Sequence, residues 1–174
     1  MSPWPKEIHR TLRGAGVRAV GYVPDAGHKE LIELCRADRS MRAVVLSTEE
    51  EGIGLAAGAW LGGMRSALLM QSSGVGNCIN HLGSVRECRF PLLMLVTMRG
   101  QVGEFNPWQV PLGQATPGVL AAMGVVVMQA DSAGAIAPAV DAAARLAFGS
   151  YQAVAVLISQ AVIGIKSFQE QRSR

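Results

Sequence analysis

A run of three glutamates, residues 49–51, stands directly before a segment rich in glycine and apolar residues. Carboxylates at that place suit the start of a helix, where Ser47 or Thr48 would be the N-cap and Glu50 or Glu51 would complete a capping box. The glycines that follow weaken an ordinary helix by up to about 1 kcal/mol each relative to alanine. Glycine also lets another group approach the helix closely, so the alternative is that one glutamate of this crowded helix start is catalytic.

A second candidate segment, residues 74–80, combines two glycines with two asparagines. A glycine-containing turn that opens a helix can bind phosphate through its backbone N–H groups. Ile79 stands where a dinucleotide-binding fingerprint needs its third glycine, so a plain tight turn is an equal alternative. Cys78 and His81 are three residues apart on one predicted helix face, a spacing that allows a thiolate–imidazole pair. A buried structural cysteine is the favoured interpretation of Cys78.

Further polar side chains come directly after apolar stretches of the sequence. Asp25 and His28 follow the first such stretch, Gln71 follows the third, and Arg99 follows the fourth. An arginine in that position can pair with an anionic substrate, and the alternative is a solvated loop arginine. The three cysteines show no CxxC spacing, and the one CxxH pair, Cys78 and His81, has no second ligand pair in the sequence, so we expect no metal ligands in this chain.

The elements that must position these groups are strands and helices in alternation. Short apolar runs bounded by polar residues, glycine or proline are typical of strands that are covered on both faces. Six such runs occur, at residues 17–23, 43–46, 67–70, 92–96, 125–128 and 154–158. Apolar residues at helical spacing predict helices at residues 28–36, 53–64, 79–86 and 132–148. We therefore expect one doubly wound α/β domain, with about six parallel strands, helices on both faces, and ligands at the carboxyl ends of the strands.

The composition narrows the classes of function. Apolar residues make up 49% of the 174 residues and charged residues 17%, which favours a large permanent interface over a plain alanine- and glycine-rich domain. The net charge is only +3 and aromatic residues make up 5%, with no basic stripe, so we expect no binding of nucleic acid. The odd number of cysteines and the lack of an apolar signal segment favour the cytoplasm. No apolar run is long enough to cross a membrane.

Three stretches, residues 49–63, 70–82 and 97–117, together resemble the pyrimidine-binding (Pyr) domain of thiamine-diphosphate enzymes. Within that family they are most similar to the sulfopyruvate and phosphonopyruvate decarboxylases. The resemblance extends over about residues 11 to 160. The family places its catalytic glutamate nine residues before the glycine of an Ala-x-Gly segment. Here that glycine is Gly58, and the matching residue is Glu49.

The resemblance implies a role for each candidate residue. Glu49 would be catalytic, because its carboxyl group would hydrogen-bond N1′ of the cofactor's aminopyrimidine and so activate the cofactor. The residues that would line thiamine diphosphate are Glu49, Gly74, Val75, Gly76, Asn77 and Asn80. The candidates for contact with the substrate are Asp25, His28, Gln71 and Arg99. The reaction implied is the decarboxylation of a 2-keto acid, with sulfopyruvate giving sulfoacetaldehyde and CO₂.

The family holds the cofactor's diphosphate through a divalent metal in a second domain, which is marked by Gly-Asp-Gly and a later Asn. Residues 1–174 contain no Gly-Asp-Gly, so the whole chain is expected to be one Pyr domain. A separate β subunit would then carry the diphosphate-binding (PP) domain and hold Mg²⁺, in an α₂β₂ assembly or a multiple of it. Three alternatives stay open: phosphonopyruvate or another 2-keto acid as substrate, including carboligation; a non-catalytic Pyr-like scaffold; and a monomeric module that binds a small ligand.

Overall fold

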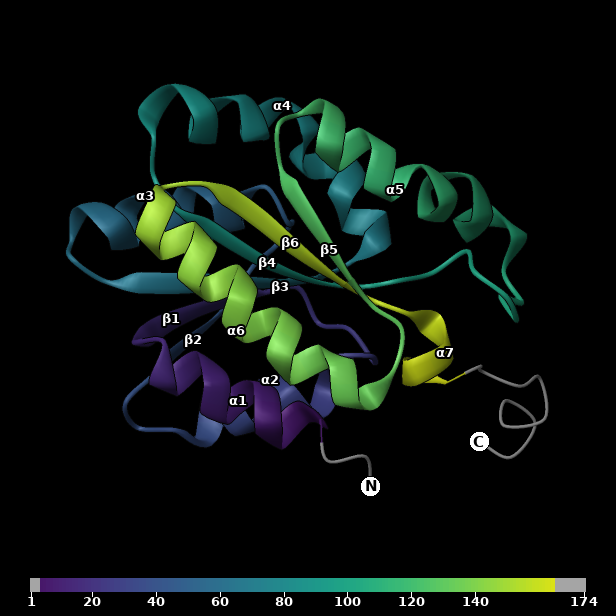
Figure 1. Cartoon of the computed structure of the whole chain (residues 1–174), viewed down its shortest axis with the longest axis horizontal. Helices are drawn as coiled ribbons and strands as arrows, with labels where there is room; N and C mark the ends of the chain where they lie inside the picture. The colour runs from purple at the N-terminus through teal and green to yellow at the C-terminus, as the bar shows by residue number, and fades with distance from the viewer. Residues whose placement is uncertain (1–3, 165–174) are drawn as a thin grey trace.

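The computed structural model describes residues 4–164, which fold around one parallel β-sheet (Figure 1). The six strands lie in the order β2-β1-β3-β4-β6-β5, and every neighbouring pair is parallel. The strands are β1 (Val17–Tyr22), β2 (Arg42–Val45), β3 (Arg65–Gln71), β4 (Leu92–Thr97), β5 (Val126–Ala130) and β6 (Ala153–Ile158). The expected α/β class and the six strands are confirmed, with ends that shift by at most two residues.

Helices cover both faces of the sheet (Figure 1). One layer consists of α1 (Trp4–Gly14), α2 (Lys29–Ala37) and α6 (Ala133–Ser150), and the other of α3 (Glu51–Leu61), α4 (Ser72–Cys88) and α5 (Val110–Ala122). A 3₁₀ turn, η1 (Pro107–Gln109), precedes α5, and the short α7 (Gln160–Ile163) follows β6. Each layer encloses its own apolar core against the sheet. Within residues 4–164, no helix is both long and apolar enough to cross a membrane.

The central strands are unbroken apolar runs in the sequence because both of their faces are buried. Every residue of β4 is buried, because β4 has a strand on each side and a helix layer on each face. β2 lies at the edge of the sheet and pairs only with β1, and Val45 at its end is 62% exposed. The centre of the sheet is therefore the rigid part of the scaffold, and β2 is its least covered strand.

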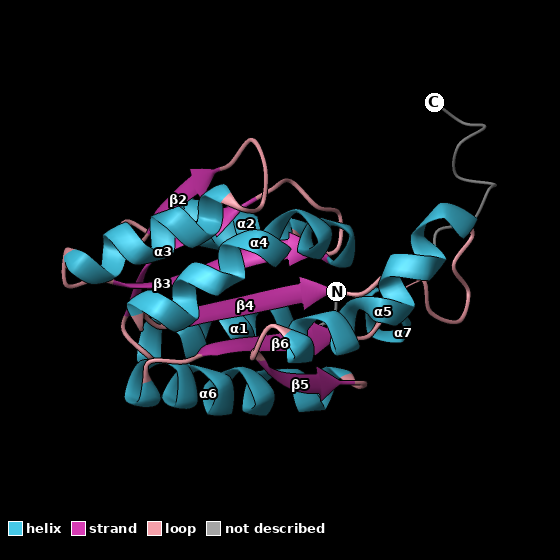
Figure 2. Ribbon diagram, turned by 90° about the horizontal axis from the view of Figure 1, so that it is seen from above, coloured by secondary structure: helices cyan, strands magenta, loops and turns pink. Residues whose placement is uncertain are grey.

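The topology creates a crevice at the carboxyl edge of the sheet. β1 and β3 are neighbours, but β1 is followed by α2 on one face and β3 by α4 on the other. Adjacent strands whose helices leave in opposite directions open a crevice at their carboxyl ends, where α/β proteins bind ligands. Figure 2 shows the arrowheads of β4, β5 and β6 at the same end of the molecule, near α5 and α7.

Two long helices were missing from the sequence prediction. α1 has a plain helical signal, since Trp4, Ile8 and Leu12 recur every four residues and are all buried. α5 has a poor local signal, because Pro117 lies inside the helix and removes a backbone donor. The Thr116 hydroxyl beside it donates to the Leu112 carbonyl at 2.7 Å, within the same helix. Tertiary packing on α4 rather than local propensity therefore specifies α5.

Candidate functional site

Glu49 lies between β2 and α3 at the carboxyl edge of the sheet, and its side chain is buried, with the residue only 8% exposed. Nδ2 of Asn77 donates to Oε2 of Glu49 at 2.9 Å. Gly74 lies against the same carboxylate, because a Cβ at position 74 would stand 2.2 Å from Cδ of Glu49. Among residues 4–164, the Glu49 side chain makes no other hydrogen bond, so Oε1 is available to a ligand.

The two neighbouring glutamates are tied to the backbone and side chains before α3. The Thr48 hydroxyl donates to the Glu50 carboxylate, and this bond holds the pKa of Glu50 below its usual value. The Ser47 N–H donates to Oε2 of Glu51 at 2.8 Å, so Glu51 is tied back to the loop before α3. The prediction that Ser47 or Thr48 is the N-cap is wrong, because Glu50 occupies that position without a side-chain cap bond. Of the three glutamates, Glu49 alone is buried.

The interpretation of residues 74–80 as a turn is wrong, because α4 begins at Ser72 and the whole segment is helical. Val75 is completely buried in the core. Gly76 faces α5, where a Cβ would stand 3.3 Å from Cδ2 of Leu112. Asn80 is exposed one turn beyond Asn77. Within this segment, the residues that contact Glu49 are Gly74 and Asn77.

Cys78 does not form the reactive pair that its spacing to His81 allows. The Cys78 side chain is buried in the core under α4, and desolvation raises the pKa of its thiol to about 12. His81 lies on the exposed side of the same helix. A thiol in that environment stays protonated at neutral pH. The favoured interpretation of Cys78 as a structural cysteine is confirmed.

A second polar cluster centres on Asp25, just beyond β1. Nε2 of Gln71 donates to Oδ1 of Asp25 at 3.0 Å, and the Thr97 hydroxyl donates to Oδ2 at 2.6 Å. Gln71 is the last residue of β3 and Thr97 the last of β4. The carboxyl ends of three strands that are separate in sequence therefore hold one carboxylate in a fixed orientation.

His28 lies beneath this cluster rather than in it. The imidazole is completely buried, and Nε2 is 3.0 Å from the Leu95 carbonyl in β4. Nδ1 has no hydrogen-bond partner among the described residues. Desolvation lowers the pKa of His28, although the nearby charge of Asp25 opposes that shift. In this arrangement His28 supports the floor of the site, and a ligand would meet Asp25 first.

Arg99 is not the free cation that the sequence suggested. Its Nε and Nη2 donate to the two carboxylate oxygens of Glu104 at 2.7 and 2.6 Å. The Glu104 side chain is 1% exposed and also accepts from Gly100 N, Asn106 N and Nε2 of Gln160. The bond from Arg99, followed by the others, lowers the pKa of Glu104 to about 2. At physiological pH both side chains are therefore charged, and their charges cancel. Nη1 of Arg99 makes no hydrogen bond to residues 4–164.

A cavity of about 190 Å³ at the carboxyl edge joins the Asp25 cluster to Arg99, and neither Glu49 nor His28 lines it. Its polar lining consists of Asp25, Gln71, Thr97, Arg99 and Gln160. Two lining residues, Thr97 and Gln160, were missed by the sequence analysis, as was Glu104 behind them. A rule that takes the polar residues after every strand would have found Gln160, which follows β6. No sequence signal distinguishes Glu104 as the partner of Arg99. Among residues 4–164, no cluster of three or more His, Cys, Asp or Glu residues is placed to hold a metal ion.

A parallel, doubly wound sheet with its polar groups at the carboxyl edge defines a ligand-binding α/β domain. Residues 6–104 match the family model described as thiamine pyrophosphate enzyme, N-terminal TPP binding domain. The match covers more than half of the chain, and the chain belongs to this family. Thiamine diphosphate is therefore its cofactor.

Individual relatives agree with the family. The chain is 33% identical to the sulfopyruvate decarboxylase subunit alpha of Methanothermobacter thermautotrophicus, over 87% of this chain and 92% of that protein. It is 39% identical to the protein of the same name from Methanococcus maripaludis, over 65% of this chain and 68% of that protein. A phosphonopyruvate decarboxylase of Streptomyces hygroscopicus is 38% identical over 53% of this chain, which is 23% of that protein's length.

The fold also occurs among solved structures. A 2-oxoglutarate:ferredoxin oxidoreductase from Magnetococcus marinus superimposes with a TM-score of 0.76 at 16% sequence identity, over 95% of this chain and 30% of that chain. At that identity the likeness shows a shared fold.

Proposed function

We propose that this chain is the pyrimidine-binding subunit of a two-subunit, thiamine-diphosphate-dependent decarboxylase that converts sulfopyruvate to sulfoacetaldehyde and CO₂. The observation that carries the proposal is the buried carboxylate of Glu49, which Asn77 orients and Gly74 accommodates. Two relatives that this chain matches over 68% and 92% of their length are both named as alpha subunits of sulfopyruvate decarboxylase.

The residues around Glu49 fit the pyrimidine end of the cofactor. A buried carboxylate with one oxygen held by an amide and the other without a partner can form a hydrogen bond to a ring nitrogen. Oε1 of Glu49 would share a proton with that ring nitrogen. Asn77 would keep the carboxylate in a fixed orientation through its bond to Oε2, so that Oε1 faces the ring nitrogen. When bound, thiamine diphosphate supplies the thiazolium that accepts the electrons of the bond to CO₂.

The proposal assigns the diphosphate and Mg²⁺ to a partner subunit with a PP domain. Residues 4–164 hold no metal-ligand cluster, and residues 1–174 contain no Gly-Asp-Gly segment. An anionic diphosphate needs a divalent cation and its carboxylate ligands. We place these in the partner, so that the reaction occurs between the two chains in an α₂β₂ assembly or a multiple of it.

We propose that the substrate binds in the cavity at the carboxyl edge of the sheet. Nη1 of Arg99 and the amide of Gln71 are the donors there, and Asp25 is a candidate for proton transfer. Because Glu104 neutralises Arg99, this chain offers the sulfonate hydrogen bonds but little net positive charge. A second cation from the partner subunit therefore completes recognition of the anion.

The decisive experiment measures CO₂ release from sulfopyruvate by the complex of this chain with its PP-domain partner, supplied with thiamine diphosphate and Mg²⁺. Glu49→Gln is expected to lower kcat by about 100-fold or more, because an amide cannot exchange the proton. Glu51→Gln is the matched control, since it makes the same change two residues away on an exposed side chain. Full activity of Glu49→Gln would contradict a catalytic role and favour a scaffold.

Phosphonopyruvate is the comparison substrate, because one relative of this chain is named for it. A higher kcat/KM with sulfopyruvate supports the assignment. A higher value with phosphonopyruvate would replace it with that relative's activity. If a cofactor-loaded complex turns over neither acid, the chain serves a different thiamine-diphosphate reaction.

A further inference from the structure

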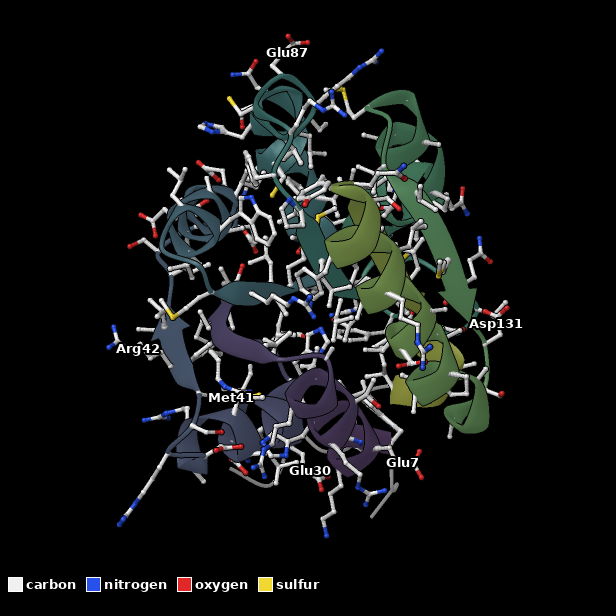
Figure 3. The ribbon with its side chains drawn as sticks, turned by 60° about the vertical axis from the view of Figure 1, so that its left-hand side comes forward. Glu7, Glu30, Met41, Arg42, Glu87 and Asp131 are labelled. Atoms are coloured by element: carbon white, nitrogen blue, oxygen red, sulfur yellow. The ribbon has the colours of Figure 1, made fainter. Side chains whose placement is uncertain are left out.

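The carboxylate that pairs with Arg99 is held partly from outside its own loop. Figure 3 shows Glu7 of α1 and Glu30 of α2 pointing outward, as surface carboxylates do. The Glu104 side chain, in contrast, is only 1% exposed. Among residues 4–164, four of its five donors belong to the loop after β4, namely Nε and Nη2 of Arg99, Gly100 N and Asn106 N. The fifth donor is Nε2 of Gln160, the first residue of α7, which lies 3.0 Å from Oε2 of Glu104.

Gln160 and Gln101 bind each other reciprocally and so join α7 to the loop. Oε1 of Gln160 accepts from the Gln101 N–H at 3.0 Å, and Oε1 of Gln101 accepts from the Gln160 N–H at 2.7 Å. The Ser159 hydroxyl donates to the same oxygen of Gln101 at 3.1 Å. Gln160 is only 4% exposed. We call Gln101 and Gln160 the glutamine clasp, because together they fasten the loop that carries Glu104 to the end of β6.

The amide of Gln160 uses both of its functional groups. Its oxygen accepts from the Gln101 backbone while its nitrogen donates to Glu104, and an amide side chain supplies such a donor and acceptor together. A carboxylate at position 160 would meet Glu104 with the same charge. Leucine would leave the buried partners of both bonds without a hydrogen bond. The geometry at this position therefore requires an amide.

The backbone of Arg99 is anchored independently of the clasp. Its N–H donates to the Ser72 hydroxyl at 3.0 Å, and its carbonyl packs on α5, where a Cβ at Gly113 would stand 2.0 Å from it. What the clasp fixes is the Glu104 carboxylate, which binds Nε and Nη2 of Arg99. Because a guanidinium group is planar and rigid, fixing two of its nitrogens also fixes the direction of the third, Nη1.

We propose that Gln160 is a positioning residue for the substrate, which acts through Glu104 to direct Nη1 of Arg99 into the cavity; this inference rests on the proposed function. Arg99 and Gln160 both line the cavity, whereas Glu49 does not. Loss of the clasp should therefore weaken binding of the anionic substrate and leave the cofactor and the chemical step unaffected. In kinetic terms, KM rises while kcat is retained.

The test compares Gln160→Leu with Gln152→Leu in the complex with the PP-domain partner, thiamine diphosphate and Mg²⁺. Gln152 is exposed and lies just before β6, at the opposite end of that strand from Gln160. Gln160→Leu is expected to raise KM for sulfopyruvate about 10-fold with kcat within about twofold of wild type. Gln152→Leu is expected to keep both constants within about twofold. Circular dichroism and titration with thiamine diphosphate should show an unchanged fold and cofactor affinity in both variants.

Two further variants separate positioning from packing. In a background with Arg99→Met and Glu104→Gln there is no guanidinium to direct, so adding Gln160→Leu should leave KM unchanged. A further rise in KM in that background would show that Gln160 acts without Arg99, and would overturn the proposal. Gln101→Ala breaks the clasp from an exposed loop residue, and it decides the question if Gln160→Leu does not fold. It should raise KM with kcat retained, and a wild-type KM would count against the proposal.

A binding measurement keeps this inference separate from the proposed function. The probe is 3-sulfopropanoate, which has the carboxylate and sulfonate of sulfopyruvate but no keto group, titrated into the cofactor-loaded complex. Weaker binding to Gln160→Leu than to Gln152→Leu supports the positioning role, even if the wild-type complex does not decarboxylate sulfopyruvate and the proposed function fails. Equal affinity of the two variants, or no binding to the wild type, overturns the positioning role.

Discussion

Glu104 accepts five hydrogen bonds on its two carboxylate oxygens, although nothing in the sequence predicts this role. We predict that Glu104→Gln lowers the free energy of unfolding by about 3 kcal/mol at pH 7, because it leaves the Arg99 charge without a partner. The pKa of Glu104 is lowered from 4.5 to about 2 in the folded chain. The carboxylate therefore stabilises the fold above pH 4.5, and this stabilisation is lost as the pH falls towards 2.

Urea unfolding from pH 7 down to pH 2 measures this effect. The difference between wild type and Glu104→Gln should shrink as the solution becomes acidic. Glu87→Gln is the matched control, because Glu87 is exposed on α4 and its substitution should change stability little at any pH. A difference that stays constant between pH 5 and pH 2 would show that the ion pair does not set the stability of this loop.

At the scale of elements, the turn that precedes α3 meets α4 through Glu49 and Gly74. A Cβ at position 74 would stand 2.2 Å from Cδ of Glu49, so Gly74→Ala must displace either the helix or the carboxylate. We predict a loss of about 1–3 kcal/mol for Gly74→Ala in the wild-type chain. In a Glu49→Ala background the same substitution should be neutral or slightly stabilising, because the obstructing side chain is absent and alanine favours helix. A double-mutant cycle by thermal unfolding measures the coupling, and independent effects of the two substitutions would contradict the contact.

The elements also show what the sequence could and could not predict. All six strands were predicted, because the central ones are covered on both faces and even the edge strand β2 contains a short run of apolar residues. α5 was missed because Pro117 and its glycines oppose helix locally, and only contact with α4 and with the Arg99 loop specifies it. Gly113 shows this dependence, since a Cβ there would stand 2.0 Å from the Arg99 carbonyl. In the site, residue types predicted Asp25, Gln71 and Glu49 at one edge, but neither the pairing of Arg99 nor the burial of His28 is encoded in local sequence.

For the whole molecule, the position of each strand predicts the order in which it opens. β4 is buried throughout and lies between β3 and β6, whereas β2 pairs only with β1 at the edge. We predict that amide hydrogens of β4 exchange only on global unfolding, and that those of β2 exchange orders of magnitude faster through local opening. Native-state hydrogen exchange read by mass spectrometry measures both. Equal protection of β2 and β4 in the uncomplexed chain would show that the edge strand is not a separate unit of stability.

The contact between Gly74 and Glu49 also links two positions in evolution. A descendant of this domain that lost the carboxylate at position 49 would no longer need a glycine at position 74. The two losses would accumulate together, since alanine is the better helix former once the space is free. A sequence of this family that keeps the glutamate should therefore keep the glycine. A sequence whose domain has only a structural role and no catalytic role should have lost both residues.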